Sequence, residues 1–381
     1  MLKFNENGKF RIMQVSDIQD TQFTSKNTIE FLGAAIDYEK PDLVVFTGDQ
    51  VKGYGTFLML GDRDKNTETT IRNFMKPLAE RNTPFTFVFG NHDAQVFASS
   101  KERQLEIYKS YPSCLAEAGE KELAGLCNHN LEIKDSKGEK TVFNLYMFDS
   151  LSASPSGKCD HVTEGQLDWY RRTRDRLKKE NGEYVKSIVF QHIPVPEIWY
   201  LLKLVAKNEK PYAVGYGDLE GKYFAIDKKY LKPGNNDFVL ETPGTPYENS
   251  GEFDVLREKG DVIGAFFGHD HNNSFVGEFM GLKLGYAQGL GFNVYGPYMD
   301  RGVRIIDLDE NNLNIFETHT LHYKDLFKFK DIHQKARYLI YSASPPSPAV
   351  VKPLLKKTAK VLAVAAAVTV SALFIAKKID K

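Results

Sequence analysis

At residues 85–93 the chain reads FTFVFGNHD, and this stretch sets the fold class expected of the molecule. Its apolar first half predicts a short buried strand, and Gly90, Asn91, His92 and Asp93 follow that strand directly. The same layout, an apolar run followed by side chains that can bind a metal ion, recurs in FRIMQVSD (10–17), DLVVFTGD (42–49), SIVFQH (187–192) and DVIGAFFGHDH (261–271).

Longer stretches with helical spacing separate these predicted strands. Apolar residues recur with the period of an amphipathic helix over 27–40, 70–82 and 165–180. Strands that alternate with helices predict an α/β fold in which a parallel sheet is covered on both faces. Beyond residue 273, shorter strand-like runs lie between glycines, and this part reads as mostly antiparallel.

The polar residues after the strands predict a metal site. In an open α/β sheet the carboxyl ends of the strands share one edge, where ligands bind. A single Asp or His after a strand is usually a turn or capping residue, but five successive cases favour a shared site. Gly48, Gly90 and Gly268 would let the backbone approach the site closely. The predicted ligands are Asp17, Asp49, Asn91, His192, His269 and His271.

These residues resemble a known family. The blocks DIQ, GD, GNHD, QH and GHDH, which contain the predicted ligands, are similar to those of the calcineurin-like metallophosphoesterases. The phrases GQLDWY, GDVIGAFFGHDHNN and GVRIIDL resemble the branch of that superfamily related to purple acid phosphatases. The resemblance covers residues 8–320 and implies a four-layer α/β/β/α sandwich.

The resemblance also implies two divalent metal ions, Mn, Fe or Zn, and a hydrolase of phosphomonoesters or phosphodiesters. Asp49 would bridge both ions, with Asp17 and His271 completing the first site. Asn91, His192 and His269 would complete the second site. A pair of ions about 4 Å apart lowers the pKa of a bound water and clamps the phosphoryl oxygens, so that hydroxide attacks phosphorus in line.

His92 follows a predicted ligand directly and should lie at the rim of the site. The resemblance makes it the group that stabilises the phosphate or protonates the leaving oxygen, with Asp93 as a candidate partner for its ring. The alternative interpretation is a turn histidine capped by Asp93. Asp270 and Asn272 are expected to hold loops rather than to contact substrate.

Two positions depart from the family pattern. Most relatives have His two residues after the first Asp, where this chain has Gln19. Gln19 could bind the first ion weakly through its amide oxygen, Asp20 could substitute, or water could fill the position. Purple acid phosphatases have a tyrosinate ligand where this chain has Lys52, and Tyr54 lies off the spacing. We therefore expect a colourless enzyme.

Composition and charge exclude other classes. The chain has 381 residues, 42% of them hydrophobic, and its 50 basic and 50 acidic residues cancel, so nothing indicates a nucleic-acid partner. Three cysteines without a CxxC pair suggest neither a disulfide framework nor a thiolate zinc site. The competing hypothesis is a catalytically silent scaffold, because some members of the superfamily keep the fold after losing ligands.

The chain divides into a catalytic body and a tail. We expect a metallophosphoesterase domain over 1–325, with a Tyr-, Pro- and Gly-rich insertion or lid at about 195–260. Its Trp199, Tyr200, Tyr212, Tyr216 and Tyr223 could stack on a leaving group or pack the insertion onto the body.

A Pro- and Ser-rich linker is predicted over 326–348, followed by a basic, apolar tail over 349–381. The uncharged run 361–376 has lysines on both sides and predicts a C-terminal apolar helix that contacts membrane lipid, the alternatives being a core or a surface helix. The N-terminus lacks a secretory signal pattern, so we expect a membrane-associated protein with a cytosolic catalytic domain, or otherwise a cytoplasmic one.

Overall fold

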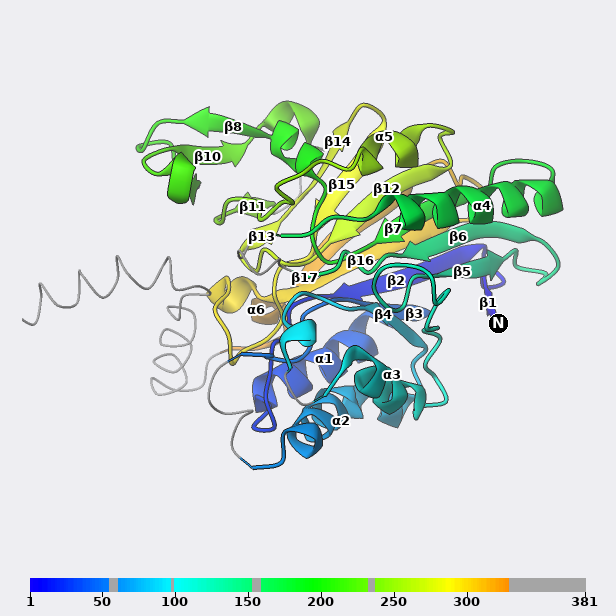
Figure 1. Cartoon of the computed structure of the whole chain (residues 1–381), viewed down its shortest axis with the longest axis horizontal. Coiled ribbons are helices and arrows are strands. Elements are labelled where there is room, and N and C mark those ends of the chain that lie inside the picture. The colour runs from blue at the N-terminus through cyan, green and yellow to red at the C-terminus, as the bar shows by residue number, and fades with distance from the viewer. Residues whose placement is uncertain (55–60, 97–98, 153–158, 232–236, 329–381) are drawn as a thin grey trace, which may run out of the picture.

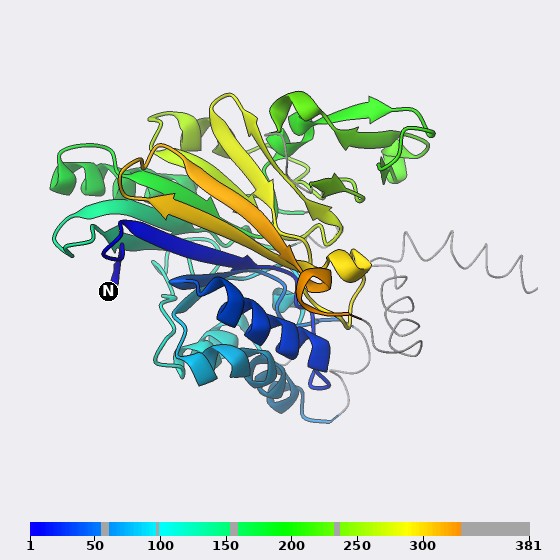
Figure 2. The ribbon, with the colours of Figure 1, turned by 180° about the vertical axis from the view of Figure 1, so that it is seen from behind.

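Two β-sheets stacked face to face form the centre of the molecule, and helices cover their outer faces (Figures 1 and 2). The structure is a computed structural model that describes residues 1–54, 61–96, 99–152, 159–231 and 237–328. The α/β class and the four-layer α/β/β/α arrangement expected from the sequence are confirmed. The linker, the tail and its predicted apolar helix lie outside the described residues, apart from the first residues of the linker.

The first sheet has five strands, and its three strands nearest the predicted ligands run parallel. The antiparallel pairs β17·β16 and β16·β2 precede the parallel pairs β2·β3 and β3·β4. In spatial order the strands are β17 (Phe316–His322), β16 (Gly302–Asp309), β2 (Lys9–Val15), β3 (Leu43–Thr47) and β4 (Phe85–Val88).

The second sheet has seven strands with a parallel centre. Strands β6, β7, β12 and β15 are parallel neighbours, and β5 and β14 pair antiparallel at the two sides of this centre. In spatial order the strands are β1 (Leu2–Lys3), β5 (His129–Lys134), β6 (Thr141–Met147), β7 (Lys186–Phe190), β12 (Val262–Phe267), β15 (Leu282–Tyr286) and β14 (Val276–Phe279).

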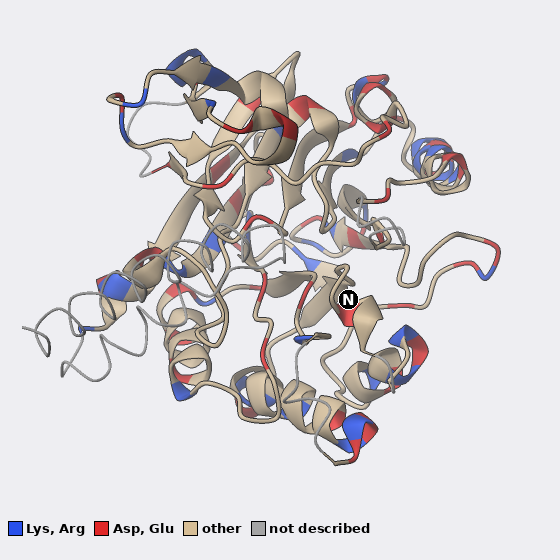
Figure 3. Ribbon diagram, turned by 60° about the vertical axis from the view of Figure 1, so that its left-hand side comes forward, with Lys and Arg blue, Asp and Glu red and all other residues tan. Residues whose placement is uncertain are grey.

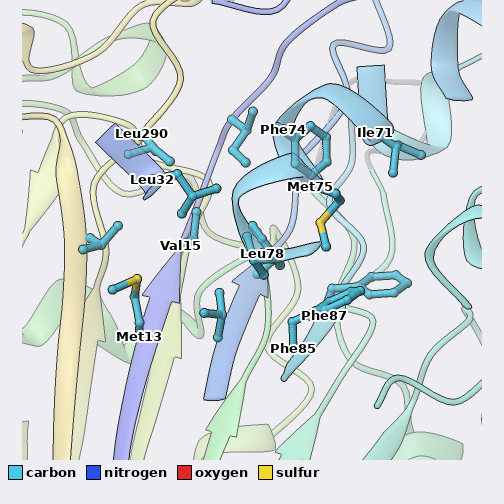
Figure 4. Close-up of a cluster of buried hydrophobic side chains, with 14 of the residues drawn as sticks. Met13, Val15, Leu32, Ile71, Phe74, Met75, Leu78, Phe85, Phe87 and Leu290 are labelled. Carbon is cyan, nitrogen blue, oxygen red and sulfur yellow. The ribbon is translucent and has the colours of Figure 1, made fainter. Parts of the chain in front are cut away.

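Apolar side chains on both faces of the strands fill the layers between the two sheets and between sheets and helices. Successive side chains of a strand point to opposite faces, so Ile12 packs between the sheets while Met13 packs toward the helices. The helical side of the five-stranded sheet holds Phe74, Phe85 and Phe87 in one apolar cluster (Figure 4). The covering helices are α1 (Lys26–Glu39), α2 (Arg63–Arg81) and α3 (Lys101–Lys109) on this sheet, and α4 (Glu164–Asn181) and α5 (Glu252–Arg257) on the other.

The expected insertion packs on the seven-stranded sheet through its buried apolar residues and α5, and its middle part forms a small sheet beside it (Figure 1). Its strands β8, β10 and β9 make a three-stranded sheet, and β11 pairs with β13 near the predicted ligands. The remaining elements are β8 (Leu202–Val205), β9 (Ala213–Val214), β10 (Tyr223–Ile226), β11 (Phe238–Val239), β13 (Asn273–Ser274), α6 (Tyr323–Leu326) and the 3-10 turns η1 (Asp93–Gln95), η2 (Pro196–Leu201), η3 (Gly217–Leu219), η4 (Lys228–Tyr230) and η5 (Tyr298–Asp300).

One expectation about the sheet was wrong. The alternation of strands and helices predicted a single parallel sheet, but the strands divide between two stacked sheets. The antiparallel strands β16 and β17 extend the first sheet beside β2. The inner face of each sheet packs on the other sheet and not on helices.

Charge is spread over the outside of the molecule. Acidic and basic segments alternate along the outer helices (Figure 3). Among the described residues, no helix is both long enough and apolar enough to cross a membrane. The predicted membrane contact of residues 349–381 is therefore untested, because the tail is not described.

Candidate metal centre

All predicted ligands lie on loops that leave the carboxyl ends of strands. Asp17, Asp49 and Asn91 follow β2, β3 and β4 of the five-stranded sheet. His192 follows β7, and His269 and His271 follow β12, which belong to the other sheet. The residues meet because the two sheets stack with these strand ends at one side. The sequence had suggested that they share the edge of one sheet, and this was wrong.

Four ligand atoms converge around His192. Its Nε2 atom lies 3.2 Å from Asp49 Oδ2 and 3.1 Å from Asn91 Oδ1. The Nδ1 atom of His269 lies 3.2 Å from the same nitrogen. Asp49, His192 and His269 each offer one ligand atom within 4.8 Å of the others, a group that could hold a metal ion.

The backbone fixes one proton of His192. Its Nδ1 lies 2.9 Å from the carbonyl oxygen of Thr47, which can only accept a hydrogen bond, so Nδ1 carries a proton. Burial lowers the pKa of His192, but the charge of Asp49 outweighs it and raises the pKa to about 10, so without an ion Nε2 carries a second proton that is directed toward Asp49. An ion held by Asp49, Asn91 and His192 would take the place of that proton.

The pair Asp17 and His271 has the same character. His271 Nε2 lies 3.3 Å from Asp17 Oδ1, while its Nδ1 donates to the carbonyl of Tyr295 at 2.9 Å. Asp17 Oδ2 accepts hydrogen bonds from the Ser16 hydroxyl and, at 3.0 Å, from the backbone N–H of His269. Asp17 Oδ1 is buried and has no hydrogen-bond partner among the described residues, which suits an oxygen that binds an ion.

Backbone geometry marks the same loops. Asp17, Asp49 and His269 have positive φ angles of 51°, 54° and 73°, a region that side chains other than glycine rarely adopt. Conformations of this kind cost about 1–3 kcal/mol each and cluster at functional sites, where the surrounding structure enforces them. Three of the predicted ligands are thus held in strained backbone positions.

Glycines next to the ligands have no room for a side chain. A Cβ atom at Gly90 would overlap the carboxylate and the backbone N–H of Asp49. A Cβ atom at Gly48 would lie 2.5 Å from His192 Nδ1. The close backbone approach expected from the sequence is present at both positions.

Comparison with known proteins agrees with this geometry. A family model described as calcineurin-like phosphoesterase matches residues 10–273. The chain belongs to the calcineurin-like phosphoesterase family. The chain is 30% identical over 345 residues to Probable inactive purple acid phosphatase 29 of Arabidopsis thaliana, covering 81% of this chain and 79% of that protein.

Two further similarities extend the comparison. Phosphatase DCR2 of Saccharomyces cerevisiae is 27% identical over 366 residues, which cover 87% of this chain and 57% of that protein. Among solved structures, a dimetal phosphatase from Danio rerio aligns with a TM-score of 0.48 at 13% identity, over 82% of this chain and 99% of that chain. The resemblance to the purple acid phosphatase branch, stated from the sequence, is confirmed by the curated relatives.

The two residues considered as substitutes for the missing imidazole are placed differently from that expectation. Gln19 directs its amide Nε2, not its oxygen, toward Asp49 Oδ2 at 2.8 Å. Asp20 is buried, but its carboxylate accepts hydrogen bonds from Asn293 and from the backbone of Thr21 and Ser25. Burial raises the pKa of Asp20 to about 6. Asp20 therefore holds a loop and does not face the ligand cluster.

His92 lies at the rim of the ligand cluster, as expected from its position directly after Asn91. Its side chain is 18% exposed and its Nε2 is 3.9 Å from Asp49 Oδ2, whereas Asp49 is 1% exposed. The expected pairing of its ring with Asp93 was wrong. The ring nitrogen Nδ1 lies 2.7 Å from Gln95 Oε1, and Asp93 instead accepts hydrogen bonds from the backbone of three neighbouring loop residues.

Side chains that the sequence pattern did not single out support the ligands. Tyr295 stacks its ring on His271 with the centroids 4.0 Å apart, and its hydroxyl donates to Glu241 at 2.8 Å. Tyr54 donates to Gln19 Oε1 at 3.0 Å. The loop 289–296 also borders the site, because Gly291 N–H donates to the carbonyl of Asp17. Nothing in the sequence spacing marks Gln95, Tyr54 or Tyr295.

The loop-holding roles expected of two further residues are present. Asp270 accepts hydrogen bonds from the backbone N–H of Gly244 in the insertion, at 3.0 and 3.2 Å. Asn272 contacts Glu241, which also belongs to the insertion, at 3.1 Å through its backbone N–H. The insertion therefore borders the loop that carries His269 and His271.

The aromatic residues of the insertion mostly contact one another. Trp199 packs on Phe224 with ring centroids 5.1 Å apart, and Tyr212 packs on Tyr223 at 4.6 Å. Tyr200 stacks on Phe279 of β14 with ring centroids 4.7 Å apart, a contact that supports the alternative in which the rings pack the insertion onto the body. Tyr216 is 56% exposed, and its contact with a leaving group stays a prediction.

Proposed function

We propose that this chain is a metal-dependent hydrolase of phosphoester bonds. The observation that carries the proposal is the convergence of four acceptor atoms, Asp49 Oδ2, Asn91 Oδ1, His192 Nε2 and His269 Nδ1, beneath a partly exposed His92. Such a donor set fits a divalent ion with nitrogen and oxygen ligands, here Mn, Fe or Zn. This is the second site predicted from the sequence, and the residues that would hold the ion of the first site are Asp17, Asp49 and His271.

Bound ions would polarise the phosphoryl oxygens and supply an activated water. The chain fixes the ligands that hold them. Asp49 Oδ1 accepts a hydrogen bond from the backbone N–H of His92 at 2.7 Å, so that its other oxygen is directed toward His192. Burial and the charge of His192 lower the pKa of His269 to about 3, which keeps this imidazole neutral and able to donate a lone pair.

His92 is the residue placed to meet the substrate. Its side chain is 18% exposed, its Nδ1–H donates a hydrogen bond to Gln95 Oε1, and its Nε2 lies 3.9 Å from Asp49 Oδ2. From this position Nε2 can contact a phosphoryl oxygen or hold a proton for the leaving oxygen. Asp93 acts as a positioning residue for the Asp49 loop.

A second candidate function is a binding scaffold without catalysis. Two relatives, Probable inactive purple acid phosphatase 29 and 14 of Arabidopsis thaliana, carry names that favour it. The ligand set of this chain favours the hydrolase, because the His of GNHD and both His of GHDH are present. A scaffold would bind a phosphoester without turnover at any metal composition.

The tail adds a proposal about location. The uncharged run 361–376 and its flanking lysines support contact of the C-terminal tail with membrane lipid. This proposal is separate from the catalytic one, because the ligands all lie between residues 17 and 271.

The experiment that tests the hydrolase is a turnover assay on purified protein, with Mn, Fe, Zn and Mg supplied in turn. The panel should contain phosphomonoesters, phosphodiesters and nucleotides. We expect release of phosphate or alcohol with at least one metal, abolished by chelation and restored by that metal. Binding of a phosphoester without turnover under every condition would support the scaffold.

A further inference from the structure

The amide of Gln19 lies between a hydrogen-bond donor and an acceptor. On one side, the hydroxyl of Tyr54 donates to Gln19 Oε1 at 3.0 Å. On the other side, Gln19 Nε2 donates to Asp49 Oδ2 at 2.8 Å. The carboxylate of Asp49 can only accept, so it requires the N–H side of the amide. The Tyr54 hydroxyl could also accept from a turned amide, but its own hydrogen would then lose the acceptor that Gln19 Oε1 provides, so both partners favour the same orientation of Gln19.

This orientation affects the oxygen that the two ions would share. Asp49 Oδ2 is the atom that also faces His192 Nε2 at 3.2 Å. The N–H of Gln19 directed at this oxygen takes up one of its lone pairs, which an ion held by Asp17 and His271 would need in order to share Asp49. A cation at that position has to compete with the N–H, and it gains no oxygen ligand from Gln19 in return.

Two contacts hold the ring of Tyr54 in place. It packs against the ring of His92 with centroids 4.5 Å apart, and the ammonium group of Lys52 lies 5.2 Å from its ring centroid. A phenol is ordinarily protonated at neutral pH, so the hydroxyl of Tyr54 is a donor to Gln19.

We propose that Tyr54 is a positioning residue that locks Gln19 with its N–H toward Asp49 and so weakens binding of the first metal ion. The inference rests on the proposed function, because it assumes the two metal positions. It predicts that the chain binds one ion tightly through Asn91, His192 and His269 and a second one weakly. Turning the amide of Gln19 would convert a competing donor into an oxygen ligand.

The test is a Mn²⁺ titration of the full chain after its metal has been removed by chelation. Binding is measured by calorimetry and by the electron paramagnetic resonance signal of free Mn²⁺. Wild-type protein should show one tight and one weak site. Tyr54→Phe keeps the ring on His92 but removes the donor, so the weak site should bind about tenfold tighter, a change typical of residues behind a ligand. Tyr146→Phe, a buried phenol in the core of the other sheet, is the matched control and should change nothing.

A double-mutant cycle identifies the route of the effect. Gln19→His should also tighten the weak site, and adding Tyr54→Phe to it should have no further effect, because the amide that Tyr54 holds is gone. If Tyr54→Phe alters the circular dichroism spectrum, Gln19→Ala tests the same competition, since it removes the N–H without adding a ligand.

If the weak site of a folded Tyr54→Phe protein bound Mn²⁺ with unchanged or lower affinity, the role of Tyr54 would be overturned and the metal centre would stand. A wild-type chain that binds no Mn²⁺ at all would instead overturn the proposed function and, with it, this inference.

Discussion

The carboxylate of Asp93 holds the backbone of Asp49: its Oδ2 accepts the N–H of Asp49 at 2.8 Å. The same oxygen accepts the N–H of Gly90 at 2.9 Å, and Oδ1 accepts the N–H of Val51 at 2.8 Å. One buried side chain thus joins the loops after β3 and β4. The position of the central carboxylate depends on it.

Asp93→Asn should therefore weaken both folding and metal binding. An amide has one accepting oxygen, so at least one of these N–H groups would meet a second donor, which costs about 1–3 kcal/mol of unfolding free energy. Urea unfolding and Mn²⁺ titration measure the two effects. Asp168→Asn, an exposed side chain on α4, serves as the control and should be close to neutral. A variant as stable as wild type with unchanged affinity would contradict the role of Asp93.

His92→Ala should remove turnover without removing metal. The side chain lies at the rim and is not needed by the converging acceptor atoms, so we expect turnover to fall about 10² to 10⁴-fold, the usual contribution of general acid catalysis. Metal content by mass spectrometry should match wild type. His319→Ala, a half-exposed histidine beside Glu39, is the control. Loss of metal in His92→Ala would make His92 a ligand instead.

Stability should fall at mildly acidic pH because of His129. Burial lowers the pKa of this histidine to about 4, while the unfolded chain has an ordinary value near 6.5. The unfolded state therefore binds the proton at higher pH. The contribution of His129 to the free energy of unfolding is complete above about pH 6.5 and is lost as pH falls toward 4. At pH 5 this contribution is smaller by about 2 kcal/mol.

Urea unfolding of the metal-free protein at pH 7.5 and pH 5 measures this loss. In His129→Gln the difference between the two pH values should shrink by about the same 2 kcal/mol, because the titrating group is absent. An equal pH difference in both proteins would assign the acid sensitivity to other groups.

Much of the fold follows from local patterns, and the rest depends on contacts that spacing does not encode. The helix expected at 27–40 is observed as Lys26–Glu39, and that expected at 165–180 as Glu164–Asn181. The latter begins with a capping box between Thr163 and Gln166, which fixes its start locally. The helix expected at 70–82 begins earlier, at Arg63, where the side chain of Asp62 caps it. The prediction missed these first turns because they are polar and show no apolar period.

The candidate site divides in the same way. Asp49 and His269 follow apolar strands with a glycine before them, so local sequence predicts them. Gln95 contacts His92 within one 3-10 turn, a local contact that residue spacing did not single out. Tyr54 contacts Gln19 from a separate loop, so this pairing is set by packing between loops. The division of the strands into two sheets also needs long-range pairing, as between β2 and β16. Single-sequence patterns carry no signal for such contacts.

Deletion of residues 349–381 should leave turnover unchanged and release the protein from membranes. All proposed ligands precede the tail, and the Pro- and Ser-rich segment before it separates the two. Membrane fractionation of full-length and truncated protein, with turnover measured on both, checks this. Full-length protein found entirely in the soluble fraction without detergent would contradict the membrane proposal.

The most direct test of the central claim is metal content and phosphoester turnover measured on the same samples of wild type and Asp49→Ala. One carboxylate serves both ion positions, so we expect wild type to bind Mn²⁺ and to hydrolyse a phosphoester, and Asp49→Ala to lose both metal and turnover. An Asp49→Ala protein that kept its metal and normal turnover would contradict the metal centre described here.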